Sequence, residues 1–405
     1  MINNNPNQPK EFDAVLGGKN PLPIDGVVLG GIEGIKHRLK SVNPRERATV
    51  LIDVLRYGNE GLDLLVESLI DPSEQVRLFA GILLRDKGGE RGKQALLKHN
   101  PSLLLTTLDN WKFESFSPNI GINASVSTAY DVNCYDGQYI VLRDREYKEF
   151  TLEYLQAFLK DPQVCEVEAL ACWSASDPYN SERCEKLINL LCNARKRLTN
   201  LKALFIGDRR EHEYKKADFY MKQLSPILDA ILEAFPDLQV IKLRGQFDRK
   251  ECSTTLRHNK LKTLIIETPN SILGQICNLE LPALEYLEVW NAGSTHGAKS
   301  ILTGQVFPNL CYLGLPSFEN TDRLMEAIAQ APTRHLAILD LHLGELTDKG
   351  AKFLINSPII KHLHTLNIAK NCLSEKMTQR FSKLNCHVIV TPQGTSGDRY
   401  CALHE

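Results

Sequence analysis

The residue types that most often carry catalysis occur in this sequence, but without the spacing that catalysis requires. Eleven cysteines are scattered along the chain, and no two of them have the Cys-x-x-Cys spacing of a zinc ribbon or a thiol oxidoreductase. No Gly-x-Ser-x-Gly motif supplies a serine nucleophile. His362 and His364 share one face of a predicted strand, but no third metal ligand accompanies them. The sequence therefore predicts no catalytic residue, no metal site and no cofactor.

The side chains best suited to recognition lie in the C-terminal half of the chain. Aromatic rings flanked by charges are typical of the side chains that anchor protein interfaces. Here tyrosine, tryptophan, acidic and basic side chains recur at alternate positions of successive leucine-rich segments. We expect them to bind a protein or peptide partner. The predicted binding set comprises Tyr286, Glu288, Trp290, Tyr312, Asp340, His342 and Arg244.

The elements that must position this set are copies of the segment Leu-x-x-Leu-x-Leu. In each copy the leucines of a strand point into a core, while the residues between them point to the opposite face. Amphipathic helical stripes separate the copies, and a proline often precedes the next strand. Strand, turn and helix in repetition predict a curved solenoid with a parallel sheet on its concave side. The eight copies begin at Val167, Leu201, Leu238, Leu261, Leu284, Leu310, Leu336 and Leu363.

Aligning the eight copies predicts three columns of side chains that face the concave surface and bring the binding set onto adjacent strands. An alternative is that the helical module or a C-terminal segment covers this face, so that the rings belong to the core. The third position of each copy reads Ala169, Ala203, Val240, Thr263, Tyr286, Tyr312, Ile338 and Thr365. The fifth reads Ala171, Phe205, Lys242, Ile265, Glu288, Gly314, Asp340 and Asn367. The seventh reads Trp173, Gly207, Arg244, Glu267, Trp290, Pro316, His342 and Ala369.

A different period governs residues 32–99, which predict short helices that each carry an apolar stripe. An apolar triplet that begins at Leu51 recurs 28 residues later at Phe79. Asp71 is a plausible N-cap of the second unit, because Pro72 follows it and proline suits the first turn of a helix. Two such units are too few to be stable alone, so we expect the module to cap the solenoid.

The helical segment is similar to a known repeat. The run Asp71-Pro72-Ser73-Glu74-Gln75-Val76-Arg77 resembles the start of a short HEAT-like repeat of the kind first described in phycobilisome lyases. The doubled Val-Leu-Gly-Gly at 15–18 and 28–31 is similar to a leader that precedes such repeats in cyanobacterial proteins. The resemblance implies an all-α module. It also suggests an alternative function, that of a lyase-like or chromophore- or small-ligand-handling regulatory protein.

From Glu149 onward the chain resembles an uncharacterised bacterial leucine-rich-repeat family of the ribonuclease-inhibitor-like type. The resemblance runs through 201–208, 256–258, 281–285 and 339–341. It implies a leucine-rich-repeat horseshoe and brings no reaction with it. Asn371 occupies the position at which such repeats place an asparagine whose amide satisfies backbone groups of the turn.

The predicted fold class is thus an α/β solenoid, a leucine-rich-repeat horseshoe with an N-terminal all-α HEAT-like module. Between the two parts, Asp136-Gly137 predicts the turn of a hairpin that joins 128–134 to 139–143. The predicted divisions are a disordered tail (1–11), the HEAT-like module (12–109), a capping region with the hairpin (110–150), the solenoid (151–390) and a C-terminal tail (391–405).

Composition narrows the partners and the compartment. The 405 residues include 48 basic and 49 acidic side chains, for a net charge of −1, so no general field attracts nucleic acid or an anionic membrane. No apolar run approaches the length that spans a bilayer. Scattered cysteines in apolar segments indicate a reduced, cytoplasmic protein. We therefore expect a non-enzymatic cytoplasmic scaffold or adaptor with an unknown protein or peptide partner, and no nucleic-acid or membrane partner.

Overall fold

The computed structural model describes residues 31–134, 139–142, 145–148, 152–173, 181–207, 224–245, 256–268, 271–290, 294–329 and 336–395. The chain forms two compact units, which are divided between Leu104 and Leu105. The predicted tail at 1–11 and most of the predicted leader lie outside the described residues. Each unit is considered by itself below.

The described part of the N-terminal unit contains five α-helices. Helix α2 begins where Asn43 accepts a hydrogen bond from the Arg45 N–H at 3.0 Å, with Pro44 in the first turn. Leucines from neighbouring helices, including Leu51 and Leu84, are fully buried between them. The helices are α1 (Gly31–Arg38), α2 (Pro44–Val54), α3 (Gly58–Ser68), α4 (Glu74–Lys87) and α5 (Gly89–His99).

Asp71 is not the N-cap of the second unit, and that prediction is wrong. Helix α4 begins at Glu74, and Ser73 occupies the N-cap position. The Asp71 carboxylate instead accepts two hydrogen bonds from the Arg47 guanidinium, both 2.8 Å long, and one of 2.7 Å from the Ser73 N–H. The bonds from Arg47 are the main reason that the pKa of Asp71 lies below its usual range. The carboxylate therefore links the start of α4 to α2, which a pattern within one segment does not reveal.

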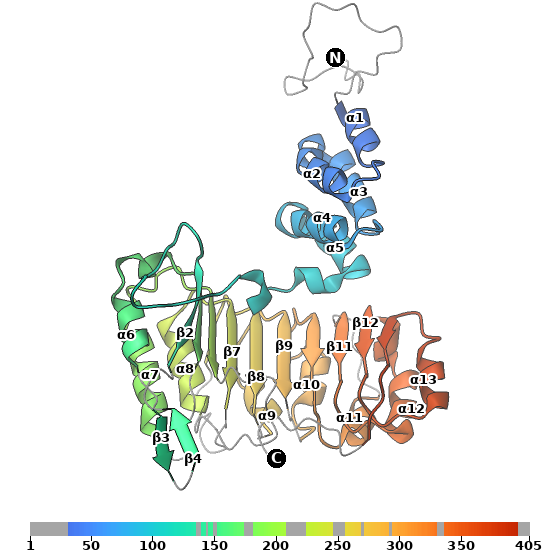
Figure 1. Cartoon of the computed structure of the whole chain (residues 1–405). Helices are drawn as coiled ribbons and strands as arrows, with labels where there is room; N and C mark the ends of the chain where they lie inside the picture. Colours follow the sequence, from blue (N-terminus) through green and yellow to red (C-terminus); the bar gives the residue numbers. More distant parts are fainter. Residues whose placement is uncertain are drawn as a thin grey trace, which may run out of the picture. The chain divides into compact units, whose positions relative to one another are not determined.

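The second unit is built on one parallel sheet, which has eleven strands within the described residues and does not close on itself (Figure 1). Eight strands lie where the repeats predict them, and their register reproduces the third and fifth predicted columns in full and the seventh in part. Their leucines form one continuous core. The eight are β5 (Ala169–Trp173), β6 (Ala203–Gly207), β7 (Val240–Arg244), β8 (Thr263–Glu267), β9 (Tyr286–Trp290), β10 (Tyr312–Gly314), β11 (Ile338–Asp340) and β12 (Thr365–Asn367).

Three further strands extend the sheet beyond the predicted repeats. These are β1 (Glu114–Ser115) and β2 (Ala129–Asn133) at one end and β13 (His387–Ile389) at the other. The predicted hairpin is therefore wrong in its first strand, because β2 pairs in parallel with β1 and β5. The second strand, β3 (Tyr139–Leu142), pairs instead with β4 (Arg145–Lys148) in antiparallel fashion. Burial decides the pairing of β2, since its inward side chains Tyr130 and Val132 belong to the solenoid core.

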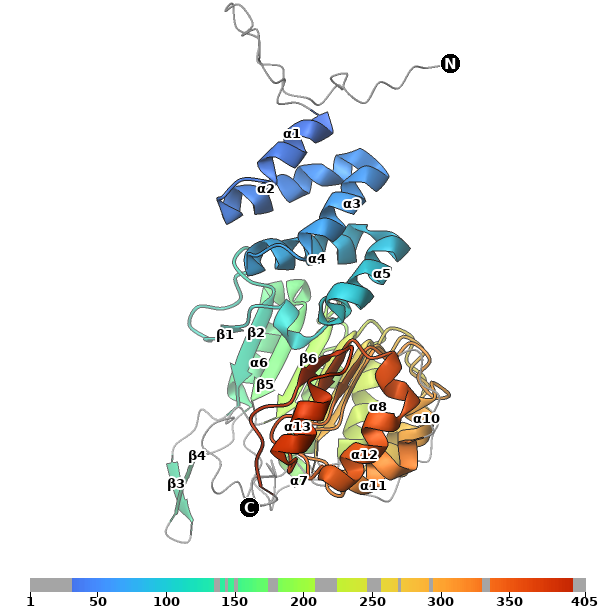
Figure 2. The ribbon, with the colours of Figure 1, turned by 90° about the vertical axis from the view of Figure 1, so that its right-hand side faces the viewer.

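Helices cover one face of the sheet (Figure 2). Each connects one strand to the next in parallel orientation and buries its apolar stripe on the leucines. Phe158 and Phe381 are fully buried in this layer. The helices are α6 (Glu153–Lys160), α7 (Ser181–Asn193), α8 (Leu224–Ala234), α9 (Leu273–Ile276), α10 (Ala298–Leu302), α11 (Thr321–Ile328), α12 (Asp348–Asn356) and α13 (Glu375–Phe381). Among the described helices, none is both long and apolar enough to span a bilayer.

The predicted role of Asn371 is confirmed. Its side chain is completely buried, and its amide nitrogen donates to the carbonyls of Leu341 at 2.9 Å and of Ile368 and Ala369 at 3.2 Å. Its amide oxygen accepts from the Leu346 N–H at 2.9 Å. One side chain thus satisfies the backbone groups of two consecutive turns.

Candidate functional site

Six of the seven predicted binding residues come together on the face of the sheet opposite the helical layer (Figure 2), which the sequence predicts to be concave, on and just after strands β9, β10 and β11. The register places Tyr286 opposite Tyr312, and the next outward row runs from Glu288 through Gly314 to Asp340. Gly314 makes the cluster possible, because a Cβ atom there would lie 2.8 Å from Cε1 of Tyr312. The missing side chain lets the Tyr312 phenol lie across its own strand, between two carboxylates.

The two tyrosines form a stacked pair. Their ring centroids are 3.9 Å apart and the rings are nearly parallel, with 4° between their planes. The Tyr286 hydroxyl hydrogen-bonds to Oε2 of Glu288, and the Tyr312 hydroxyl lies 3.2 Å from the same oxygen and 3.3 Å from Oδ2 of Asp340. Burial and the charge of Glu288 raise the pKa of both tyrosines well above the usual value. The hydroxyls therefore stay protonated and act as donors to the carboxylates.

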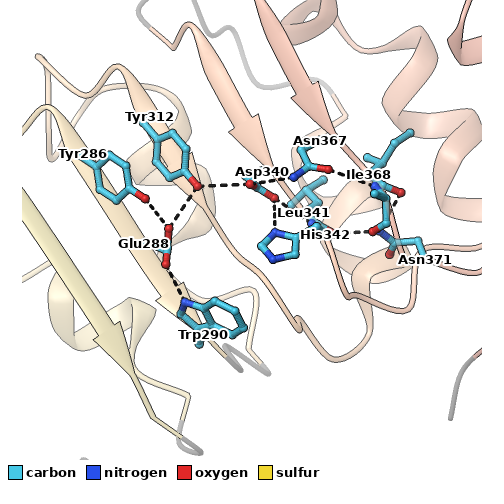
Figure 3. Close-up of polar contacts among 11 residues, drawn as sticks. Tyr286, Glu288, Trp290, Tyr312, Asp340, Leu341, His342, Asn367, Ile368 and Asn371 are labelled. Carbon is cyan, nitrogen blue, oxygen red and sulfur yellow. Dashed lines mark hydrogen bonds and ion pairs between the residues drawn. The ribbon is translucent and has the colours of Figure 1, made fainter. Parts of the chain in front are cut away.

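Trp290 and His342 complete the cluster (Figure 3). The indole N–H of Trp290 donates to Oε1 of Glu288 at 2.7 Å, and its ring meets the His342 ring edge to face at 5.6 Å. Nδ1 of His342 lies 2.6 Å from Oδ1 of Asp340. All six side chains lie partly in contact with solvent, Asp340 least. We call Tyr286, Glu288, Trp290, Tyr312, Asp340 and His342 the aromatic–carboxylate patch.

Arg244, the seventh predicted binding residue, belongs to a separate cluster on β7 and β8. Its Nε donates to Oε2 of Glu267, and Nζ of Lys242 lies 2.9 Å from the other oxygen of that carboxylate. Glu267 is only 3% exposed. Burial by itself would raise the pKa of Glu267, but the charges of Lys242 and Arg244 outweigh it and hold this pKa below the usual value. Arg244 thus compensates the buried negative charge of Glu267 on the neighbouring strand.

Sequence reasoning did not identify Lys242 and Glu267 as partners of Arg244. The aligned columns contained a signal for this cluster. Arg244 on β7 and Glu267 on β8 are adjacent in the seventh column, and Lys242 lies on β7 in the fifth. The Lys242 ammonium also lies 5.3 Å from the centre of the Phe205 ring, a distance suited to a cation–π interaction.

The segment that precedes the sheet covers part of the concave face. Leu108, Trp111 and Phe113 pack on a row of small residues at the start of β2, β5, β6 and β7, namely Ala129, Ala169, Ala203 and Val240. The indole N–H of Trp111 donates to Glu168 at 3.2 Å, and the hydroxyl of Thr263 donates to the Thr106 carbonyl. The third column is therefore covered up to β8 by the segment at 106–113, which is neither of the two covers that the sequence suggested. The next two residues of that column, Tyr286 and Tyr312, are partly exposed.

The described residues contain no group of three or more metal-ligating side chains placed to hold an ion. His362 is exposed, and His364 interacts with the Thr365 hydroxyl at 2.8 Å. Burial raises the pKa of the Cys134 thiol to about 12 and that of Cys172 well above its usual value. These two thiols are therefore protonated at neutral pH and poor nucleophiles.

Among the comparisons with known proteins, one solved structure bears on the fold and none shows a family. No family model matches the chain, and no curated protein matches it either. A crystal structure of a Bacteroides fragilis protein is similar, with a TM-score of 0.50, 22% identity, and coverage of 68% of this chain and 77% of that chain. At this identity the likeness concerns the fold alone. A Listeria monocytogenes internalin covers 74% of this chain and 71% of its own at 14% identity, and its TM-score of 0.34 is too low for an argument.

The repeats, the parallel sheet and the helical layer are those of a leucine-rich-repeat solenoid. The HEAT-like, phycobilisome-lyase-type character of the N-terminal helices stays a prediction. No comparison supports the alternative of a lyase-like or chromophore-handling protein.

Proposed function

We propose that this protein is a non-enzymatic scaffold or adaptor that binds a protein or peptide partner on the concave face of its sheet. The observation that carries the proposal is the aromatic–carboxylate patch, where three large aromatic rings remain partly exposed on a face whose first strands are already covered. Tryptophan and tyrosine are the residues most enriched among side chains that dominate binding energy. The cytoplasmic location stays a prediction from the cysteines.

The geometry of the patch favours binding because its rings are held in place before a partner arrives. Glu288 accepts hydrogen bonds from both tyrosines and from Trp290, which restricts the rotamers of all three rings. Side chains that are already ordered lose little conformational entropy on binding, and this loss otherwise costs about 0.5–1.5 kcal/mol for each immobilised side chain. A repeated sheet also presents the extended concave surface on which solenoid proteins bind their partners.

Replacing Trp290 or Tyr312 with alanine should release the partner. Each substitution removes an anchoring ring, which at a binding hot spot weakens the complex by about 2 kcal/mol or more. The measurement is affinity purification of the tagged full-length protein from its source cells, with quantitative mass spectrometry of what co-purifies.

The matched control is Lys352→Ala on the exposed surface of α12, which should retain the same co-purifying protein. Thermal melting of each variant separates loss of binding from loss of folding, and we expect melting temperatures close to that of the wild type. Equal recovery of co-purifying proteins by all variants, or a collapse of stability in both aromatic variants, would show that the rings serve the core and not a partner.

A further inference from the structure

The charges of the aromatic–carboxylate patch differ from those elsewhere on the same sheet. Glu267 at the end of β8 and Glu168 just before β5 are each paired with lysine or arginine. In the part of the chain that the structure describes, Glu288 forms no ion pair with a lysine or an arginine. The ionic contact described for Asp340 is with His342, which carries charge only when protonated. The patch therefore holds two negative charges that no lysine or arginine of the described chain compensates.

Neutral donors hold these two carboxylates in place. Tyr286, Tyr312 and Trp290 donate to Glu288, while Asn367 donates to Asp340 at 3.0 Å. Such donors orient the oxygens and leave the net charge unchanged. A carboxylate oxygen can accept more than one hydrogen bond, so Oε1 of Glu288, which accepts from Trp290, retains the capacity for another donor. The arrangement is that of an oriented pair of anions, of which Glu288 is partly exposed and Asp340 is largely buried.

The rings around the carboxylates add a second attraction for a cation. The faces of tryptophan and tyrosine rings carry negative electrostatic potential and attract ammonium and guanidinium groups within about 6 Å. This sheet already uses such a contact, since the Lys242 ammonium lies 5.3 Å from the Phe205 ring centre. A planar guanidinium can stack on a ring and donate to a carboxylate together, which an ammonium does less well.

We infer that the partner of the concave sheet presents a basic side chain, preferably arginine, to Glu288 and Asp340 beside the rings of Trp290 and the tyrosine pair. The inference rests on the proposed function and specifies the chemistry of the partner. The expected partner is a protein or peptide segment that carries a positive charge, because charge complementarity with two carboxylates that no lysine or arginine of the described residues pairs selects against neutral and acidic segments.

The test uses a random peptide library displayed on phage, selected on the full-length protein. We expect the selected peptides to be enriched in arginine, and the enrichment to disappear on selection against Trp290→Ala. A synthetic copy of a selected peptide in which citrulline replaces the arginine should bind about tenfold more weakly or worse, because citrulline keeps the shape and loses the charge. Its affinity should also become less sensitive to salt.

Glu288→Gln supplies the matched protein variant, since it keeps the acceptor oxygen and removes one charge. It should weaken binding of the arginine peptide and leave binding of the citrulline peptide nearly unaffected. Glu326→Gln on the exposed surface of α11 should change the affinity of neither peptide. Asp340→Asn offers a second variant if Glu288→Gln melts early. Selected peptides that need Trp290 but carry no basic residue would overturn the inference and leave the proposed function standing. A selection with no Trp290-dependent peptide would count against both.

Discussion

Replacing Glu267 with glutamine should lower the free energy of unfolding by about 3–5 kcal/mol, the usual cost of removing one partner from a buried ion pair. Glu267 is 3% exposed and accepts from Arg244, with Lys242 at 2.9 Å from its other carboxylate oxygen. The substitution leaves two cations at the sheet face without their shared counter-charge. Urea denaturation, monitored by the unfolding of the solenoid, measures the loss of stability.

The matched control is Glu280→Gln, which removes the same charge from an exposed ion pair. Arg257 and Glu280 lie 3.1 Å apart with 61% and 50% of their side chains exposed, so this change should cost less than about 1 kcal/mol. Acid gives a further check. Because the pKa of Glu267 is lowered in the folded state, its contribution is present above the unfolded pKa and is lost as the pH falls through the folded pKa. The wild type and Glu267→Gln should thus converge in stability on acidification. If Glu267→Gln and Glu280→Gln lost equal stability at neutral pH, this explanation of the cluster would be refuted.

Replacing Asn371 with alanine should cost about 2–3 kcal/mol, because buried backbone groups lose their partners. The Leu346 N–H and the Leu341 carbonyl each depend on this side chain for a hydrogen bond of 2.9 Å. The Ile368 carbonyl retains a second donor in Gln393, at 3.0 Å, which limits the loss. Chemical denaturation of the variant and the wild type gives the difference directly.

Asn309→Ala is the control for this prediction, since it removes an exposed asparagine that donates one hydrogen bond of 2.8 Å to the Pro282 carbonyl. Water can replace that donor, so we expect the free energy of unfolding to change by well below about 1 kcal/mol, as is usual for surface substitutions. Similar effects of the two substitutions would mean that the turns after β11 and β12 do not need the Asn371 amide.

The strands that were predicted correctly are those whose leucine spacing is imposed by the core. In β9, for example, Leu287 and Val289 must both point inward, so Tyr286, Glu288 and Trp290 must all point outward. The strands that were missed lack this pattern. Strand β2 has no leucine, and the Asp-Gly sequence after it suggested a local hairpin that a non-local parallel pairing replaced.

The strand register was enough to predict which residues of the site are neighbours. The column alignment placed the six residues of the patch together, since neighbouring positions in a column are neighbours across strands. It did not show that Arg244 turns to Glu267, because the direction of a long side chain depends on the charges around it. The cover formed by Trp111 was also missed. The run of alanines at Ala169 and Ala203 was its signal, since small residues on an outward face leave space for another segment.

Position-specific cross-linking in the source cells tests most directly whether a partner lies on the concave sheet. A photo-reactive amino acid would replace Ile389, which is 39% exposed on β13 in the same outward row as Asn367, and in a second protein it would replace Lys352 on α12. The account predicts a cross-linked partner from position 389, lost when Trp290 is also changed to alanine, and none from position 352. Cross-links from position 352 alone, or cross-links from position 389 that persist without Trp290, would contradict it.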